Sequence, residues 1–178
     1  MGQLSAVIVP VTLFQQNCTI LFDAETRQGV VIDPGGDADK IAAALASNKI
    51  GLEAIWITHG HLDHAGGAME MKERFGVKII GPHIADKFIL DNIEVSAAGY
   101  GASEKMMNCT PDQFLIEGDV VSFGDHEFDV LHCPGHMAEH LCFALGDRLF
   151  SVDHVMCWST SLVSPPDGQM GAYLASLY

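Results

Sequence analysis

Metal-binding side chains are concentrated in one short stretch, His59-Gly60-His61-Leu62-Asp63-His64. This stretch follows residues 54–58, an apolar run whose β-branched and aromatic side chains are typical of a short buried strand. A strand that ends in such a loop brings several donor atoms to one point in space. Neutral imidazoles and carboxylates are the ligands that zinc and similar divalent metals prefer. A single histidine usually has a structural role, but four donors within six residues predict a metal site.

The composition indicates one globular domain with a sizeable core. Of the 178 residues, 48% are hydrophobic and 18% are charged. The formal net charge is −14, and no local cluster of Lys and Arg offsets it. Such a surface repels phosphate backbones, so nucleic acid is not an expected partner. The five cysteines contain no Cys-x-x-Cys pair, which argues against a disulfide framework and against a zinc site made of cysteines alone.

The N-terminal stretch does not have the pattern of a targeting segment. Residues 1–14 are apolar, but they lack a positively charged start, and Pro10 interrupts them. We therefore expect no signal peptide, no membrane span and no membrane partner. A cytoplasmic location with free, buried thiols is the simplest expectation.

Apolar runs and helical patterns alternate along the first half of the chain. Strands are predicted at residues 6–9, 18–22, 30–32, 54–58 and 77–80, and helices at 38–47, with Asp37 as a cap, at 66–75 and at 83–95. Residues 96–112 are expected to form a long, substrate-facing loop. The second half returns to strands at 119–123, 127–131, 141–145 and 149–152, and it closes with a helix at 170–177. This order predicts a layered α/β (α+β) architecture.

Two further candidate ligands each follow a predicted strand. His136 lies in the tight turn Cys133-Pro134-Gly135-His136, and Asp153 follows the strand at 149–152. His59 and His61 alternate along an extended segment, so their side chains point to the same side and could share one metal. The carboxylate of Asp153 could bridge two metals with its two oxygens.

The run His59-x-His61-x-Asp63-His64, together with His136 and Asp153, resembles the metallo-β-lactamase superfamily. Shorter segments, including Asp33-Pro34-Gly35-Gly36 and Leu131-His132-Cys133-Pro134-Gly135-His136, are similar to those of short glyoxalase II-like hydrolases. The resemblance covers essentially the whole chain. It implies one αββα sandwich domain over residues 1–178, with the metals at one edge of its two sheets.

The resemblance also implies a ligand set and a reaction. His59, His61 and His136 would hold a first metal, Asp63 and His64 would hold a second, and Asp153 would bridge them. One or two Zn²⁺ ions are expected, with iron or manganese as alternatives. A bound metal lowers the pKa of water from about 15.7 to roughly 7, which supplies a hydroxide for attack on a small acyl thioester or related ester. Asp63 would orient this nucleophile as the catalytic residue.

The chain departs from the family pattern around the bridging carboxylate and beyond it. Val152 stands where the superfamily usually has a glycine, so the carboxylate could be displaced or the pocket narrowed. Residues 153–177 look like another branch of the superfamily, and no histidine follows His154. We therefore expect a truncated or mosaic domain that lacks the usual final strands and the last His ligand. A homo-oligomer would cover the apolar surface and strand edges that this leaves exposed.

Several other side chains have competing interpretations. His132 and His140 are expected near the ligands but not as ligands, and His83 near a helix start. His126 is expected on the surface. Trp158, Ser159 and Ser161 are expected either to line the substrate pocket or to have a packing role in the fold.

Two other functional classes compete with the hydrolase. A mononuclear iron oxidoreductase, similar to persulfide dioxygenases, would use His59, His136 and Asp153 as ligands. A non-catalytic metal-binding fragment is the third possibility. A β-lactamase is disfavoured by the absence of an export signal, and a ribonuclease by the acidic composition.

Overall fold

Two β-sheets form the centre of the molecule. The computed structural model describes residues 2–103, 105–157 and 159–178. The first sheet has the order β1-β2-β3-β4-β5, and the second has the order β6-β7-β8-β9. In the first sheet β1 to β3 pair antiparallel, whereas β3, β4 and β5 run parallel. The second sheet is antiparallel throughout. The strands are β1 (Leu4–Val11), β2 (Gln16–Asp23), β3 (Gln28–Ile32), β4 (Gly51–Trp56), β5 (Lys78–Ile80), β6 (Val120–Phe123), β7 (His126–His132), β8 (Leu141–Leu145) and β9 (Arg148–Phe150).

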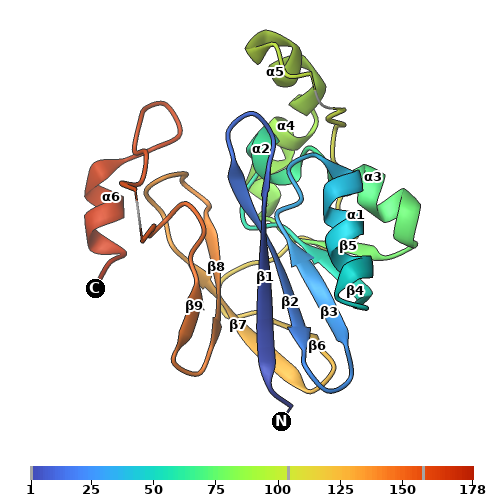
Figure 1. The fold of residues 1–178 in the computed structure, drawn as a ribbon. Helices are drawn as coiled ribbons and strands as arrows, with labels where there is room; N and C mark the ends of the chain where they lie inside the picture. Colours follow the sequence, from blue (N-terminus) through green and yellow to red (C-terminus); the bar gives the residue numbers. More distant parts are fainter. Residues whose placement is uncertain (1, 104, 158) are drawn as a thin grey trace.

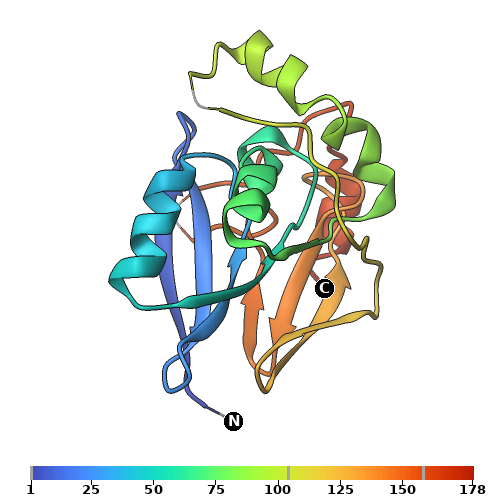
Figure 2. The same cartoon turned by 90° about the vertical axis from the view of Figure 1, so that its right-hand side faces the viewer.

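Helices flank the two sheets on their outer sides. Figure 1 shows α1 (Ala38–Ser47) and α3 (Ala68–Phe75) beside the first sheet, and α6 (Met170–Ala175) beside the second. Figure 2 shows the same layers after a quarter turn. The remaining helical segments are α2 (Leu62–Ala65), η1 (Ile84–Asp86), α4 (Lys87–Leu90) and α5 (Ile93–Tyr100). The predicted mixed α/β fold is confirmed.

Strand β4 lies between two apolar layers. Its fully buried Trp56 faces the second sheet, with its ring 5.1 Å from Phe128 and 5.2 Å from Phe143. The adjacent Ile55 belongs to the other layer, in which Ile41 of α1 also lies. Strands buried on both faces have continuous apolar sequences, which explains the run at residues 54–58. This packing holds the end of β4, and the histidine loop that follows it, in a rigid position.

Most predicted elements are present, with four corrections. The helix predicted at 66–75 begins only at Ala68, as α3, and the short helix α2, which was not predicted, precedes it; Gly66 and Gly67 lie between the two. The single helix predicted at 83–95 is divided into η1, α4 and α5, and α5 runs to Tyr100, into the predicted loop. Strand β9 ends at Phe150, earlier than predicted. Asp37 precedes α1, but its carboxylate accepts a hydrogen bond from the Thr12 amide (3.0 Å) instead of capping the helix.

The structure also shows the state of the cysteines and the character of the helices. All five cysteines are free thiols, and four of them are buried. Over the part of the chain that the structure describes, no helix combines the length and the apolar character needed to cross a membrane.

The predicted surface role of His126 is wrong. This side chain is 2% exposed, and its Nε2 lies 2.8 Å from Oδ2 of Asp23. Asp23 ends β2, whereas His126 begins β7, so the pair joins the two sheets. Backbone amides of Thr26 and Glu25 also donate to the Asp23 carboxylate, and the bonds from Thr26, His126 and Glu25 lower its pKa to about 2. The polar neighbours of His126 in sequence gave no indication of this partner, which lies 103 residues away.

We expect His126→Ala to lower the free energy of unfolding by about 2–4 kcal/mol, because it removes a buried ring and leaves Asp23 without its partner. Urea denaturation measures the change. Asp39→Ala is the matched control, since Asp39 forms an exposed ion pair with Arg74, and such pairs contribute only about 0–1 kcal/mol. Equal effects of the two substitutions on the free energy of unfolding would show that the His126–Asp23 pair does not stabilise the contact between the two sheets.

Candidate metal centre

The candidate ligands come from four segments that meet at one end of the sheets. His59 and His61 follow β4, and Asp63 and His64 lie in the first turn of α2. His136 lies in the connection between β7 and β8, and Asp153 follows β9. Loops held by rigid strands are common positions for functional groups.

Three imidazoles converge on one point. Nε2 of His59 and Nε2 of His136 each lie 3.1 Å from Nδ1 of His61. Nδ1 of His61 carries at most one proton, so it cannot donate a hydrogen bond to both neighbouring nitrogens. Tetrahedral ligands at about 2.0–2.1 Å from zinc would be about 3.3 Å apart, which is close to this spacing. The three side chains therefore fit a single divalent metal.

A second group of donors lies next to the first. Nε2 of His64 is 3.6 Å from Oδ2 of Asp63 and 3.4 Å from Oδ2 of Asp153. This nitrogen is buried and has no hydrogen-bond partner. The same Asp153 oxygen is 3.6 Å from Nε2 of His136, so this carboxylate lies between the two groups. The structure thus brings together all six predicted ligands, and their role in metal binding remains a prediction.

A buried carboxylate, Asp33, orients two of the imidazoles. Its Oδ2 accepts from the Thr58 hydroxyl (2.6 Å) and lies 3.1 Å from Nδ1 of His64. Since the Thr58 hydroxyl donates to Asp33, it accepts from Nδ1 of His59, 2.9 Å away. In its neutral form, each of the two histidines therefore carries its proton on Nδ1 and directs the Nε2 lone pair into the site.

The orientation of His136 has a different source. Its Nδ1 lies 2.6 Å from the backbone carbonyl oxygen of Leu162, which can only accept a hydrogen bond. The proton is therefore on Nδ1, and Nε2 is free to bind a metal.

Burial and neighbouring charges separate the histidines into two electrostatic groups. Burial, together with the adjacent histidines, lowers the pKa of His59 well below its usual value, and burial and His136 lower that of His61 to about 4. Burial alone would lower the pKa of His64, but the neighbouring carboxylates of Asp153 and Asp33 outweigh it and raise that pKa. Burial would raise the pKa of Asp153, but His64 and the other nearby histidines lower it. His59 and His61 are therefore kept neutral, as metal binding requires.

Two close backbone contacts support the histidine loop. A Cβ atom on Gly35 would lie 1.5 Å from the carbonyl oxygen of Asp63, so only glycine permits this approach. On the other side, Oδ2 of Asp86 accepts from the Gly60 amide at 2.8 Å. Burial raises the pKa of Asp86 to about 7. The Gly35-Gly36 segment thus has a packing role beside the histidine loop.

The remaining histidines lie around the site in different ways. His140 is buried, and its ring lies 4.8 Å from that of His59, in contact with the candidate ligands. His132 is exposed and lies 2.8 Å from the Ala138 carbonyl. His83 precedes η1, as predicted. His154 is buried, with Nε2 3.1 Å from the Ser176 hydroxyl.

Four orienting groups were not singled out from the sequence: Asp33, Thr58, Asp86 and Leu162. Asp33 had a detectable signal, because a carboxylate directly after a buried strand is the same pattern that identified Asp153. The contacts of Asp86 and Leu162 join residues 26 positions apart and had no local signal.

The residue before Asp153 has an unusual backbone conformation. Val152 has φ 44°, in the left-handed region. A β-branched residue is strained there, whereas glycine is not. Val152, which stands where the family usually has a glycine, therefore adopts the backbone conformation that favours glycine.

Comparison with known proteins identifies the family. The model of the metallo-beta-lactamase superfamily matches residues 11–151. The chain belongs to the metallo-β-lactamase superfamily. The resemblance seen in the ligand motif is thereby confirmed.

Curated superfamily relatives include two hydrolases. The hydroxyacylglutathione hydrolase GloC of Haemophilus influenzae is 38% identical over 137 residues, which cover 76% of this chain and 64% of that protein. A hydroxyacylglutathione hydrolase of Bdellovibrio bacteriovorus is 34% identical, over 75% of this chain and 45% of that protein. The chain thus spans less than two thirds of the length of either relative.

Solved structures share the superfamily fold over nearly the whole chain. TTHA1623, solved in a di-iron-bound form, is 30% identical with a TM-score of 0.79, over 95% of this chain and 83% of that one. The B3 metallo-β-lactamase BLEG-1 is 25% identical with a TM-score of 0.84, over 97% and 83%. The fold therefore supports a divalent metal centre in this chain, with zinc and iron both compatible with its His and carboxylate donors.

We expect Asp33→Asn to weaken metal binding by about 10- to 100-fold, since it removes the charge that orients His59 and His64. Competition with a chromogenic chelator measures the affinity. Asp37→Asn is the control, because Asp37 contacts the Thr12 amide instead of the histidines. Unchanged affinity in Asp33→Asn would argue against the orienting role.

We expect Val152→Gly to be more stable than Val152→Ala by about 1 kcal/mol, because both remove the side chain but only glycine relieves the left-handed conformation. Chemical denaturation of the two variants measures the difference. If the free energy of unfolding of Val152→Ala equals or exceeds that of Val152→Gly, the backbone at position 152 is not strained.

Proposed function

We propose that the protein is a metal-dependent hydrolase of the glyoxalase II-like kind, acting on a small acyl thioester or related ester. The observation that carries this proposal is the convergence of the His59, His61 and His136 nitrogens beside two carboxylates, Asp63 and Asp153, that line a cavity. The hydroxyacylglutathione hydrolases among the relatives support a hydrolytic reaction.

The residues have distinct roles in this proposal. When bound, one or two divalent metals lower the pKa of water and polarise an acyl oxygen. His59, His61 and His136 would hold a first ion, Asp63 and His64 would hold a second, and the Asp153 carboxylate lies between these two groups of donors. The Asp63 side chain is 23% exposed and lines the cavity, so its carboxylate can accept a hydrogen bond from the attacking water and orient it.

The electrostatics of the site favour a bound cation. Asp63 and Asp153 both approach the unpartnered nitrogen of His64, and Asp33 lies on the other side of that ring. Three carboxylates around one buried imidazole concentrate negative charge, which a divalent ion would neutralise. Zn²⁺ is our first expectation, and the di-iron form of TTHA1623 makes iron the main alternative.

We expect protein purified without added metal to contain one or two metal ions per chain and to cleave thioesters. Elemental analysis and a thioester panel monitored by thiol release measure these properties. Asp63→Asn should lower kcat by about 10²- to 10⁴-fold because the water loses its orienting group. Asp39→Asn, at an exposed position, should leave kcat unchanged.

Metal content of the same samples separates the alternatives. A lower metal content in Asp63→Asn would show that Asp63 acts mainly as a ligand. One iron per chain with oxygen uptake on glutathione persulfide would replace the hydrolase by the mononuclear oxidoreductase. A metal-loaded protein inactive on every thioester and without oxygen uptake would leave only a metal-binding role.

A further inference from the structure

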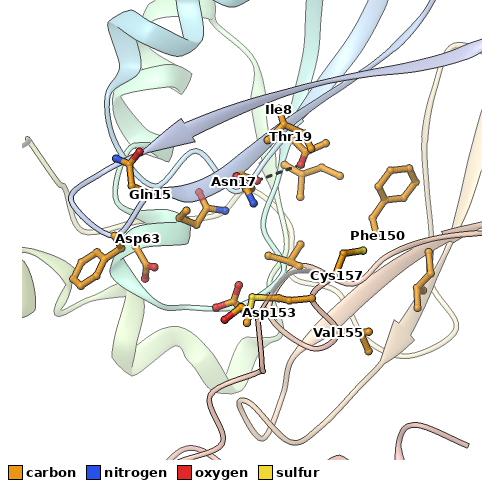
Figure 3. A pocket seen from close by; sticks show the side chains of 16 residues that line it. Ile8, Gln15, Asn17, Thr19, Asp63, Phe150, Asp153, Val155 and Cys157 are labelled. Atoms are coloured by element: carbon orange, nitrogen blue, oxygen red, sulfur yellow. Dashed lines mark hydrogen bonds between the residues drawn. The ribbon is translucent and has the colours of Figure 1, made fainter.

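A cavity of about 450 Å³ adjoins the candidate metal centre. Figure 3 shows Asp63 and Asp153 at its border, with Ile8 and Thr19 on one wall and Phe150 and Val155 on another. The walls come from β1 and β2 and from the segment around and after β9. A group bound at the carboxylates would therefore extend directly into this space.

Apolar side chains form most of the cavity wall. Several large ones remain about half exposed, including Ile8 (52%), Leu149 (50%) and Val155 (45%). Phe14 also lines the cavity, and the Tyr100 ring supports it in an edge contact at 5.9 Å. Covering such surface with an apolar ligand is favourable by about 25 cal/mol per Å². The cavity has a size and apolar lining typical of small-molecule sites.

Charge is confined to the end of the cavity at the metal centre. Asp63 and Asp153 are the only charged groups among the lining residues that the structure describes. The polar lining residues are neutral, and they include Gln15, Asn17 and Ser159. Trp158 lies outside the described residues, so its predicted place in the pocket is not assessed. Ser161, predicted with it, donates instead to the His154 carbonyl.

The cavity does not include the segment predicted to face the substrate. No described residue of 96–112 lines it. The lining also has no cationic side chain, over the same described part of the chain, to pair with a substrate carboxylate. A net charge of −14 further disfavours an anionic group at this position.

The geometry points to an apolar, uncharged acyl chain as the occupant of this cavity. This inference rests on the proposed hydrolase function and names its substrate class: acyl thioesters whose chain is longer and more apolar than a short hydroxyacyl group. The acyl carbon lies at Asp63 and Asp153, and the chain extends between Phe14 and Phe150 toward Val155.

A series of thioesters with one thiol tests this assignment. Acetyl, butanoyl, hexanoyl and octanoyl esters of N-acetylcysteamine differ only in the apolar chain. We expect kcat/KM to rise by up to about fourfold per methylene, which corresponds to about 0.8 kcal/mol. The suberyl ester has the length of the octanoyl ester but ends in a carboxylate, and its kcat/KM should be at least tenfold lower.

A charge placed in the wall should change this preference. Val155→Lys supplies a cation in the cavity wall, so it should raise kcat/KM for the suberyl ester and lower it for the octanoyl ester. Val95→Lys is the matched control, because Val95 is 71% exposed on α5 and does not line the cavity. The control variant should keep the wild-type ratio of kcat/KM for the octanoyl ester to kcat/KM for the suberyl ester.

The outcomes separate this inference from the hydrolase proposal. An active enzyme with no dependence on chain length, or with equal rates on octanoyl and suberyl esters, overturns the acyl-chain assignment and leaves the hydrolase intact. Inactivity on every ester overturns the hydrolase, and calorimetric titration with the S-ethyl and S-octyl thioethers of N-acetylcysteamine then decides the cavity assignment. Tighter binding of the S-octyl compound, weakened by Val155→Lys, supports it, and equal binding of the two thioethers overturns it.

Discussion

The buried carboxylate of Asp33 is the interaction on which the site depends. It accepts hydrogen bonds from the Thr58 amide and hydroxyl and lies beside Nδ1 of His64. A charge taken out of water is costly unless hydrogen bonds compensate it. Asp33 follows β3, Thr58 follows β4 and His64 lies in α2, so the same bonds that stabilise the charge also set the direction of two imidazoles. Fold stability and metal binding are therefore coupled at this residue.

The candidate centre is shared between the two sheets. His59, His61, Asp63 and His64 follow β4, whereas His136 and Asp153 follow strands of the second sheet. Packing of Trp56 against Phe128 and Phe143 holds the two sheets against each other. The Asp23–His126 pair adds a polar contact between the sheets. A metal bound by ligands from both halves would join the sheets further, since binding to the folded state alone stabilises it.

The segment after β9 contributes both to the candidate metal centre and to the wall of the cavity. It carries Asp153 into the centre through the strained backbone at Val152, and Val155 and Met156 then form part of the cavity wall. Strain of this kind persists only where surrounding contacts hold it. The Ser161 hydroxyl bonds the His154 carbonyl, and the Ser176 hydroxyl lies beside the His154 ring. These contacts hold the segment against α6, so the position of the carboxylate and the shape of the cavity depend on one another.

The sequence alone determined the strand-and-helix order, the limits of α1 and the set of six candidate ligands, because these depend on local periodicity and on donor spacing within a few residues. It did not determine what orients those ligands. The Asp33–Thr58, His136–Leu162 and Asp23–His126 contacts join residues 25, 26 and 103 positions apart. Such contacts arise only when strand register and sheet packing place distant side chains together. The tertiary structure likewise decided the cavity beside the centre, since its walls come from opposite ends of the chain and no local pattern encodes their approach.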